Sequence, residues 1–340
     1  MSGDAHQQEG IVNHIIRYRS FGSPDVLEEA DVPLSEPQGA DVRVRVHAVG
    51  LNPVDYKTFN GDLRALEHLR QLAHPLRRTP MFPRGVGRDF SGVITAVGPT
   101  ATGHSVGDPV LGTLRSAPGQ IVPQGALATE VIAPAETITA KPEGMSHQTA
   151  ASLGVAAETA CGAFRRLRLA ADDVIVISAA AGGVGSLASQ LALTMGATVV
   201  GIAGRGNADY LRSLGAIPVV YGQDLATRIA QASPEPVTKL LDCYGKGYAR
   251  LAADLRIPRS GRGTLVPSPG ALARGARFTG ARHALPGDLE RVTQLVASGR
   301  ITIHVANEYP MTLEGVRAAY TELAAGHTRG KIVVTADTAR

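Results

Sequence analysis

The chain of 340 residues has no tryptophan and only two cysteines, Cys161 and Cys243. Two cysteines exclude a disulfide framework and a cysteine-rich zinc site, and they suit a reducing compartment. No stretch approaches the ~18 consecutive apolar residues that can span a bilayer. The polar start MSGDAHQQEG has no apolar segment like that of a signal peptide. We therefore expect a soluble, cytoplasmic protein.

Aromatic residues are also scarce, with six Phe and eight Tyr, so the core must be built from Ala, Val, Leu and Ile. The 39 glycines and 21 prolines exceed the ~12% that these two residues usually contribute together. This mixture excludes a coiled coil, a collagen-like chain and a disordered acidic protein. It is common among α/β enzymes, and the length indicates two domains.

The charge balance gives a weak preference for anionic ligands. The net charge is +4, but the basic residues are scattered and few aromatic residues lie among them. That pattern argues against nucleic-acid binding, whereas a phosphate-bearing cofactor explains a small positive excess equally well.

The first third of the chain favours β-structure. Segments 14–22 and 41–52 alternate polar and apolar residues, and segments 92–98 and 107–112 are short strands between turns. Segment 62–78 differs, because its leucines recur every three residues among arginines. It predicts an amphipathic helix, either a lid or subunit contact beside a pocket or a surface helix docked on the strands.

From about residue 145 the pattern changes to alternating helices and strands, which predicts a doubly wound parallel sheet. An Ala-rich helix over 145–167 comes first, and an entirely apolar strand over 172–180 follows it. The further segments are helices 183–197, 208–215 and 285–301 and strands 198–203, 217–221, 238–245 and 263–269. The last strand, 331–337, resembles the N-terminal strands more than this sheet.

The stretch SAAAGGVGSLASQLA (178–192) joins a buried strand to a helix. In the pattern G-x-G-x-x-G, Ala180 takes the first place, Gly182 the second and Gly185 the third. Gly182 lets the backbone approach a pyrophosphate, and Gly185 permits close packing of helix and strand. A phosphate would then lie at the helix N-terminus. The predicted dinucleotide-binding residues of this turn are Ala181, Gly182, Gly183, Val184 and Gly185.

The end of the following strand distinguishes the two nicotinamide cofactors. An NAD site usually has an acidic residue there, about 20 residues after the glycines, to bind the ribose. This chain has Arg205 instead, and Asn207 can add a donor. Arginine can pair with a 2′-phosphate, so the sequence favours NADPH. The alternative is that Arg205 is a solvated loop residue.

Several motifs together resemble one family. They are LNPVDYKTFNG (51–61), GRDFSGVITAVG (87–98), VGDPVLG (106–112), AAAGGVG (179–185), LGA (214–216) and GHTRGKIVV (326–334). The chain is identified as similar to the medium-chain dehydrogenase/reductase superfamily, in its zinc-independent quinone oxidoreductase branch. The resemblance implies a GroES-like β-barrel domain (1–143 and 304–340) split around a Rossmann domain (144–303), with the active site between them.

The resemblance also bears on metal binding. Zinc-dependent members carry a ligand Cys where this chain has Asn52, a ligand His where it has Arg88, and a third ligand where it has Val155. A catalytic zinc needs about three such ligands, and the ten histidines lack metal-binding spacing. We therefore expect no metal.

The resemblance implies further site residues. Asn52, Tyr56 and Lys57 are expected beside nicotinamide and substrate, with Tyr56 or Lys57 as proton or hydrogen-bond donor. Alternatively, Tyr56 is a packing residue and Lys57 is the solvated end of a strand. The remaining expected cofactor-binding residues are Thr159, Gly245, Val266 and Ser268, whereas Asp55 and Asp89 look structural. The chain departs from the family at two positions. Glu158 stands where an apolar residue is usual. Gly222 stands where many members carry a tyrosine, and in this chain a tyrosine, Tyr221, lies one place earlier.

Without a metal to polarise an alcohol or ketone, hydride transfer to an already electrophilic carbon remains. The leading hypothesis is an NADPH-dependent reductase of quinones or α,β-unsaturated ketones. The alternatives are an enoyl-thioester reductase of a biosynthetic pathway and a non-catalytic, NADPH-binding interaction protein. The family also implies a homodimer.

Overall fold

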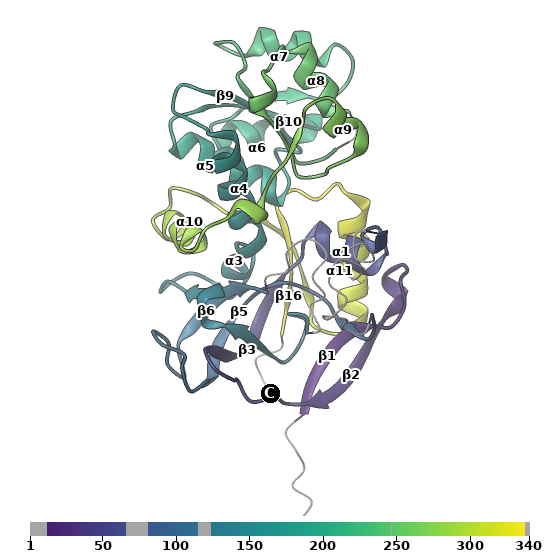
Figure 1. Ribbon diagram of the computed structural model, residues 1–340, viewed down its shortest axis with the longest axis vertical. Coiled ribbons are helices and arrows are strands. Elements are labelled where there is room, and N and C mark those ends of the chain that lie inside the picture. The colour runs from purple at the N-terminus through teal and green to yellow at the C-terminus, as the bar shows by residue number, and fades with distance from the viewer. Residues whose placement is uncertain (1–11, 66–80, 115–123, 246, 337–340) are drawn as a thin grey trace, which may run out of the picture.

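The computed structural model describes residues 12–65, 81–114, 124–245 and 247–336, so most of the predicted helix 62–78 lies outside the described residues. Figure 1 shows two bodies, with a helix-covered sheet above and a body of mainly antiparallel strands below. Both the first and the last described strands belong to the lower body. None of the described helices is long and apolar enough to cross a membrane.

The upper body is built on a six-stranded parallel sheet with the order β11-β10-β9-β12-β13-β14. Its strands are β9 (Val174–Ser178), β10 (Thr198–Ala203), β11 (Ile217–Val220), β12 (Lys239–Asp242), β13 (Arg262–Thr264) and β14 (Arg277–Phe278). Its helices are α4 (Gly154–Leu167), α5 (Gly183–Thr194), α6 (Ala208–Ser213), α7 (Leu225–Ala232), α8 (Tyr248–Asp254), α9 (Pro269–Ala273) and α10 (Asp288–Ala297).

The central strand β9 explains why helices cover both faces of this sheet. All five of its residues are buried. Ile175 and Ile177 pack into a core with α4 and α5, whereas Val174 and Val176 pack into a separate core with α7 and α8. Since neighbouring side chains on a strand point to opposite faces, an entirely apolar strand needs a cover on each side.

The lower body contains a three-stranded sheet, β2-β1-β4, and a larger sheet, β15-β16-β3-β5-β6-β8, with β7 also paired to β3. The strands are β1 (Val12–Tyr18), β2 (Leu27–Pro33), β3 (Asp41–Gly50), β4 (Arg84–Gly85), β5 (Asp89–Val97), β6 (Pro109–Thr113), β7 (Glu130–Pro134), β8 (Ile138–Ala140), β15 (Val305–Pro310) and β16 (Lys331–Thr335). Helices α1 (Pro53–Phe59), α3 (His147–Ala151) and α11 (Leu313–Ala325) accompany them.

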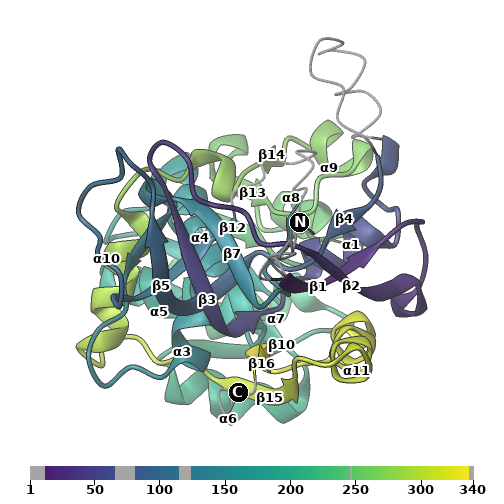
Figure 2. The same ribbon diagram turned by 90° about the horizontal axis from the view of Figure 1, so that it is seen from below.

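The last described strand returns to the first part of the chain. β16 pairs antiparallel with β3, with Val334 opposite Val49, and parallel with β15. Seen from below, α11 lies beside β2 and β15 (Figure 2), and it contacts both strands. The predicted fold class, a GroES-like domain combined with a Rossmann-type parallel sheet, is confirmed. The domain boundaries given above stay a prediction.

Some predicted elements differ from the structure. The predicted helix 145–167 is two helices, α3 and α4, because the chain turns at Ser152 and Leu153. The predicted strand 263–269 ends at Thr264, since Pro267 and Pro269 have no N–H to donate to a sheet. Helices α1, α7, α8, α9 and α11 were not predicted.

Candidate cofactor site and active site

Between β9 and α5 the chain makes the glycine-rich turn that the sequence predicted. Gly182 is the N-cap of α5 and has no side chain to cap the first-turn N–H groups. A Cβ at Gly185 would lie 2.2 Å from the carbonyl oxygen of Ala179, so glycine is needed for α5 to pack this closely. A Cβ at Gly182 would meet only that same oxygen, at 3.4 Å, so the space beside it is open. Uncapped N–H groups beside open space fit a phosphate group.

The last strand of the lower body lies directly against this turn. The N–H of Gly330 donates to the carbonyl oxygen of Ala181 at 2.8 Å, and Gly330 also forms a bridge with Gly182. The Lys331 side chain packs against Gly183, since a Cβ at Gly183 would lie 2.7 Å from Cδ of Lys331. The half-buried Val184 comes next in α5. The predicted phosphate-binding turn is therefore at the junction of the two bodies.

The next strand, β10, leads into a short 3-10 turn, Arg205–Asn207. Arg205 is exposed, and Asn207 is half-buried, with its N–H donating to the carbonyl oxygen of Gly204 at 2.9 Å. The first acidic residue after the strand, Asp209, is paired with Arg212 at 2.6 Å. The turn itself therefore carries a guanidinium and an amide and no carboxylate.

Two further residues border this turn: Arg329, which is absent from the set predicted from the sequence, and Tyr221, the tyrosine that stands one place before the family's usual position. Arg329 donates from Nε to Oδ1 of Asn207 and from Nη2 to the carbonyl oxygen of Gly206, both at 2.8 Å. A Cβ at Gly204 would lie 3.5 Å from the ring of Tyr221, so this tyrosine forms a wall of the turn. Arg329 is 122 residues from Asn207, and no local pattern in the sequence connects them.

A buried polar cluster lies on the other side of the glycine turn. The Asn52 amide nitrogen donates to Oδ2 of Asp89 at 2.9 Å and to the carbonyl oxygen of Gly50 at 3.2 Å. Its Oδ1 accepts a hydrogen bond from Nζ of Lys331 at 2.8 Å. The Lys331 Nζ is also 3.4 Å from Oδ2 of Asp89, whose Oδ1 accepts the N–H of Val155 at 2.8 Å. Asn52, Asp89 and Lys331 are all nearly inaccessible to solvent.

This cluster is also where the chain would have to hold a catalytic zinc. The residues at the expected ligand positions are Asn52, Arg88 and Val155, which offer an amide, a guanidinium and an aliphatic side chain. Zinc takes thiolate, imidazole or carboxylate ligands, and here the ammonium of Lys331 is bonded to Asn52 and Asp89. These residues do not fit zinc. Among the residues described by the structure, no group of three or more His, Cys, Asp or Glu side chains could hold a metal ion.

Asp55 connects the cluster to helix α1. Its Oδ2 accepts the N–H of Asn52 at 3.0 Å, and its Oδ1 is 3.2 Å from Nε of Arg88. Burial raises the pKa of this carboxyl group to about 6, although Arg88 acts in the opposite direction; Asp89 raises the pKa further. Asp55 therefore has the structural role expected of it, holding the start of α1.

Tyr56 and Lys57 both lie on α1, which Figure 1 shows beside α11 near the junction of the bodies. Both side chains are half-buried, and the Tyr56 ring stands edge-on to Phe59 with centroids 5.4 Å apart. Lys57 lies in the last turn of a helix, so the alternative that it ends a strand is wrong. Asn52 is the N-cap of the same helix, which brings the three expected catalytic residues into one segment.

Three of the other expected cofactor residues, Gly245, Val266 and Ser268, follow the carboxyl ends of parallel strands. A Cβ at Gly245 would lie 3.2 Å from Cγ1 of Val266, so these residues, after β12 and β13, are neighbours. Ser268 caps α9, because its hydroxyl oxygen accepts the N–H of Ala271 at 3.2 Å. Thr159 and Glu158 are buried in α4. The turns after β9 and β10 lie at the same edge of the sheet as Gly245 and Val266, where α/β proteins bind ligands.

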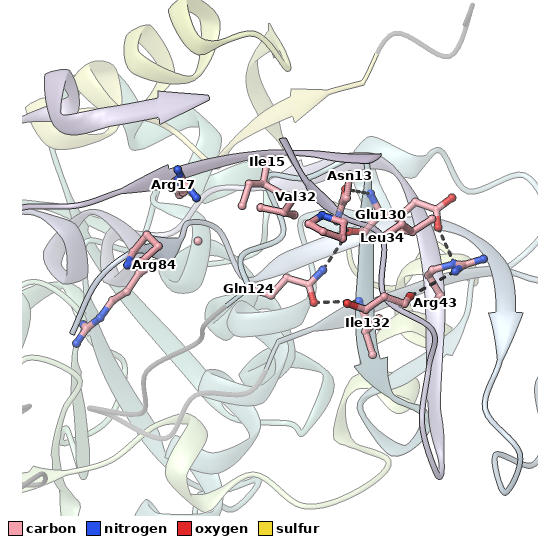
Figure 3. Close-up of a pocket in the computed structure, with 14 residues that line it drawn as sticks. Asn13, Ile15, Arg17, Val32, Leu34, Arg43, Arg84, Gln124, Glu130 and Ile132 are labelled. Atoms are coloured by element: carbon pink, nitrogen blue, oxygen red, sulfur yellow. Dashed lines mark hydrogen bonds and ion pairs between the residues drawn. The ribbon is translucent and has the colours of Figure 1, made fainter. Parts of the chain in front are cut away.

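A separate cavity of about 300 Å³ opens among β1, β3, β4 and β7 of the lower body (Figure 3). Several of its polar side chains have partners within the protein. Asn13 and Gln124 both donate to the carbonyl oxygen of Glu130, and the Glu130 carboxylate pairs with Arg43 at 2.8 Å. None of its lining residues comes from the parallel sheet.

Comparison with known proteins supports the family suggested by the motifs. Residues 38–143 match the alcohol dehydrogenase GroES-like domain, and residues 214–334 match the zinc-binding dehydrogenase family. The chain is 27% identical to a 2-methylene-furan-3-one reductase of Solanum lycopersicum, over 93% of this chain and 77% of that one. It is 29% identical to a chloroplastic NADPH-dependent alkenal/one oxidoreductase of Arabidopsis thaliana, over 93% and 78%.

Among solved structures, the quinone oxidoreductase of Coxiella burnetii is similar with a TM-score of 0.79 and 27% identity, covering 96% of this chain and 99% of that one. Fold, glycine turn and relatives together define an oxidoreductase that uses a nicotinamide cofactor. The chain belongs to the medium-chain dehydrogenase/reductase superfamily, in its zinc-independent quinone oxidoreductase branch, as the sequence motifs indicated.

Proposed function

We propose that this protein is an NADPH-dependent reductase of quinones or of the carbon–carbon double bond of α,β-unsaturated ketones. The observation that carries the proposal is the buried cluster of Asn52, Asp89 and Lys331. It bonds an ammonium group to Asn52, which stands at an expected zinc-ligand position, while Arg88 and Val155 stand at the other two and are not zinc ligands. An acceptor that is already electrophilic needs no polarisation by a metal.

The residues proposed to hold the cofactor fall into three groups. Ala181, Gly182, Gly183, Val184 and Gly185 offer the open helix N-terminus to the pyrophosphate. Arg205 and Asn207 offer a guanidinium and an amide to the 2′-phosphate, on a turn without a carboxylate. The nicotinamide half is assigned to Gly245, Val266 and Ser268 along the edge of the sheet and to Thr159 in α4.

The bound nicotinamide supplies a hydride, which leaves negative charge on the oxygen of the acceptor. Tyr56 and Lys57 are proposed to donate a hydrogen bond or a proton to that oxygen, since both side chains are partly accessible on α1. Asn52 is not proposed as a donor to the acceptor, because its side-chain amide is hydrogen-bonded to Asp89, Gly50 and Lys331. Its proposed role is to fix the start of α1 and so the position of Tyr56 and Lys57.

The test is the loss of NADPH absorbance with purified protein and a panel of acceptors. Benzoquinone and methyl vinyl ketone should each consume NADPH, and a chelator should not change the rate. A crotonyl thioester that is reduced much faster than either would favour the enoyl-thioester alternative. Tight binding of NADPH without turnover of any acceptor would contradict a reductase. The homodimer and the cytoplasmic location remain predictions.

A further inference from the structure

Helix α1 carries Tyr56 and Lys57, but it is too short to fix its own orientation. It has only seven residues, about two turns, and helices shorter than ~12 residues are marginal in water without contacts to the rest of the protein. Its C-terminal end is anchored by Phe59, which is fully buried and stands edge-on to Tyr320 of the neighbouring α11, with ring centroids 5.0 Å apart (Figure 1). The direction in which Tyr56 and Lys57 point therefore depends on what holds the rest of the helix.

The side chain of Arg88 contacts α1 at two residues. Its Nε lies 3.2 Å from Oδ1 of Asp55, and its Nη2 donates to Oγ1 of Thr58 at 3.4 Å. Asp55 and Thr58 are three residues apart, so they lie on the same side of the helix. Tyr56 and Lys57 stand between them in the sequence. A planar guanidinium that contacts both flanking residues restricts rotation of this segment about the helix axis.

Arg88 is itself held in place by the lower body. Gly87, just before it, has a φ of +86°, and a Cβ there would lie 3.2 Å from Cγ1 of Val49. The carbonyl oxygen of Arg88 accepts the N–H of Leu114 at 2.9 Å. The side chain of Arg88 is 12% exposed and that of Asp55 is 1% exposed. Because water screens such a pair only weakly, the guanidinium is a firm point of attachment for the helix.

We propose that Arg88 is a positioning residue for reduction of the acceptor. Its guanidinium holds α1 through Asp55 and Thr58, so that Tyr56 and Lys57 are directed at the acceptor oxygen. Arg88 acts through the helix and not by contact with the acceptor. This inference rests on the proposed function, and it adds to the site a residue that precedes β5 and lies outside α1.

The experiment measures steady-state reduction of benzoquinone by NADPH with full-length variants. Arg88→Ala should lower kcat about 10- to 100-fold, because a misplacement of about 1 Å can cost about 100-fold. The ratio kcat/KM should fall by the same factor, since the lost interaction belongs to the transition state. The dissociation constant of NADPH, measured by nicotinamide fluorescence, should change by less than about twofold. Arg88→Lys keeps the charge beside Asp55 and should recover part of the lost rate.

The matched control is Arg43→Ala. The side chain of Arg43 is 13% exposed, its Nε lies 2.8 Å from Oε2 of Glu130, and the same nitrogen donates to Oγ1 of Thr95 at 3.2 Å. It therefore has the same kinds of partner as Arg88, a buried carboxylate and a threonine, but these partners lie outside α1. Urea unfolding should show a loss of stability in both variants, whereas only Arg88→Ala should lose kcat.

The outcomes separate this inference from the proposed function. If the wild-type protein reduces benzoquinone but Arg88→Ala keeps the wild-type kcat, or Arg43→Ala loses as much of it, Arg88 does not position α1. The same conclusion follows if Arg88→Lys is as slow as Arg88→Ala. If the wild-type protein reduces neither benzoquinone nor methyl vinyl ketone, the proposed function is wrong, and the role of Arg88 is overturned with it.

A milder variant covers the case in which Arg88→Ala does not fold. Thr58→Val removes the hydroxyl that Nη2 of Arg88 contacts and leaves the ion pair with Asp55 in place. It should lower kcat about threefold, as expected for the loss of one hydrogen bond, with the affinity for NADPH unchanged. An unchanged kcat in Thr58→Val would contradict the proposal.

Discussion

Lys331 is a cation in the protein interior whose neighbours are an amide oxygen and a carboxylate. Its side chain is 6% exposed, and Asp89 is fully buried. Replacing Lys331 by methionine keeps the length of the side chain but leaves the Asp89 carboxylate without its counter-charge. Removing one partner of a buried ion pair usually costs about 3–5 kcal/mol, so Lys331→Met should lower the free energy of unfolding by that order. Urea unfolding of the purified variant measures the loss.

The matched variant for this prediction is the double substitution Lys331→Met with Asp89→Asn. It removes both charges while keeping the size of each side chain, so it should cost less than the sum of the two single substitutions. Strictly additive losses would mean that the ammonium and the carboxylate do not stabilise each other.

Asp55 gives the protein a pH-dependent stability. Burial raises the pKa of its carboxyl group from 3.8 to about 6. The folded state therefore binds this proton more tightly than the unfolded state, and the contribution of Asp55 to the free energy of unfolding falls as pH rises from about 4 to about 6. The full change is about 3 kcal/mol, from about 1.4 kcal/mol for each unit of pKa.

The measurement compares wild-type protein with Asp55→Asn by urea unfolding at several pH values in this range. The difference in stability between the two should shift in favour of the variant as pH rises. A difference that stays constant with pH would mean that the pKa of Asp55 is not raised in the folded protein.

At the scale of elements, two glycines of the turn between β9 and α5 are expected to have different roles, Gly185 in folding and Gly182 in cofactor binding. Gly185→Ala forces a Cβ to within 2.2 Å of a backbone oxygen, so it should destabilise the fold. Gly182→Ala meets its nearest atom at 3.4 Å, so it should fold normally but lose NADPH affinity, because the methyl group fills space meant for the pyrophosphate. Thermal unfolding and NADPH titration of both variants test this contrast. Equal effects of the two substitutions in both assays would contradict it.

The elements also show what can be predicted from this sequence. β9 and α5 carry strong local signals, an apolar run and a glycine pattern, so both can be predicted from the sequence. Helix α11 has apolar residues at Val316, Ala319, Tyr320 and Leu323, which is a helical spacing that could have been found. Helix α1 has only seven residues, and its start is held by contacts of Asp55 that depend on the folded chain. The position of Arg329 likewise depends on a long-range contact that no local pattern records.

At the scale of the whole molecule, the candidate site belongs to neither body alone. The upper body provides the glycine turn and the Arg205–Asn207 turn. The lower body provides α1, with Tyr56 and Lys57, and the segment of Arg329 and Lys331. The contact of Gly330 with Ala181 joins the two bodies at the glycine turn. A change in the angle between the bodies would therefore alter cofactor and acceptor sites together.

The return of β16 to β3 also concerns biosynthesis. The ribosome makes the chain from its N-terminus, and β16 (residues 331–335) is the last of the described strands to be made. Until those residues leave the ribosome, β3 lacks a neighbour and the glycine turn lacks Gly330. A nascent chain therefore cannot complete the candidate cofactor site before β16 has emerged and paired with β3.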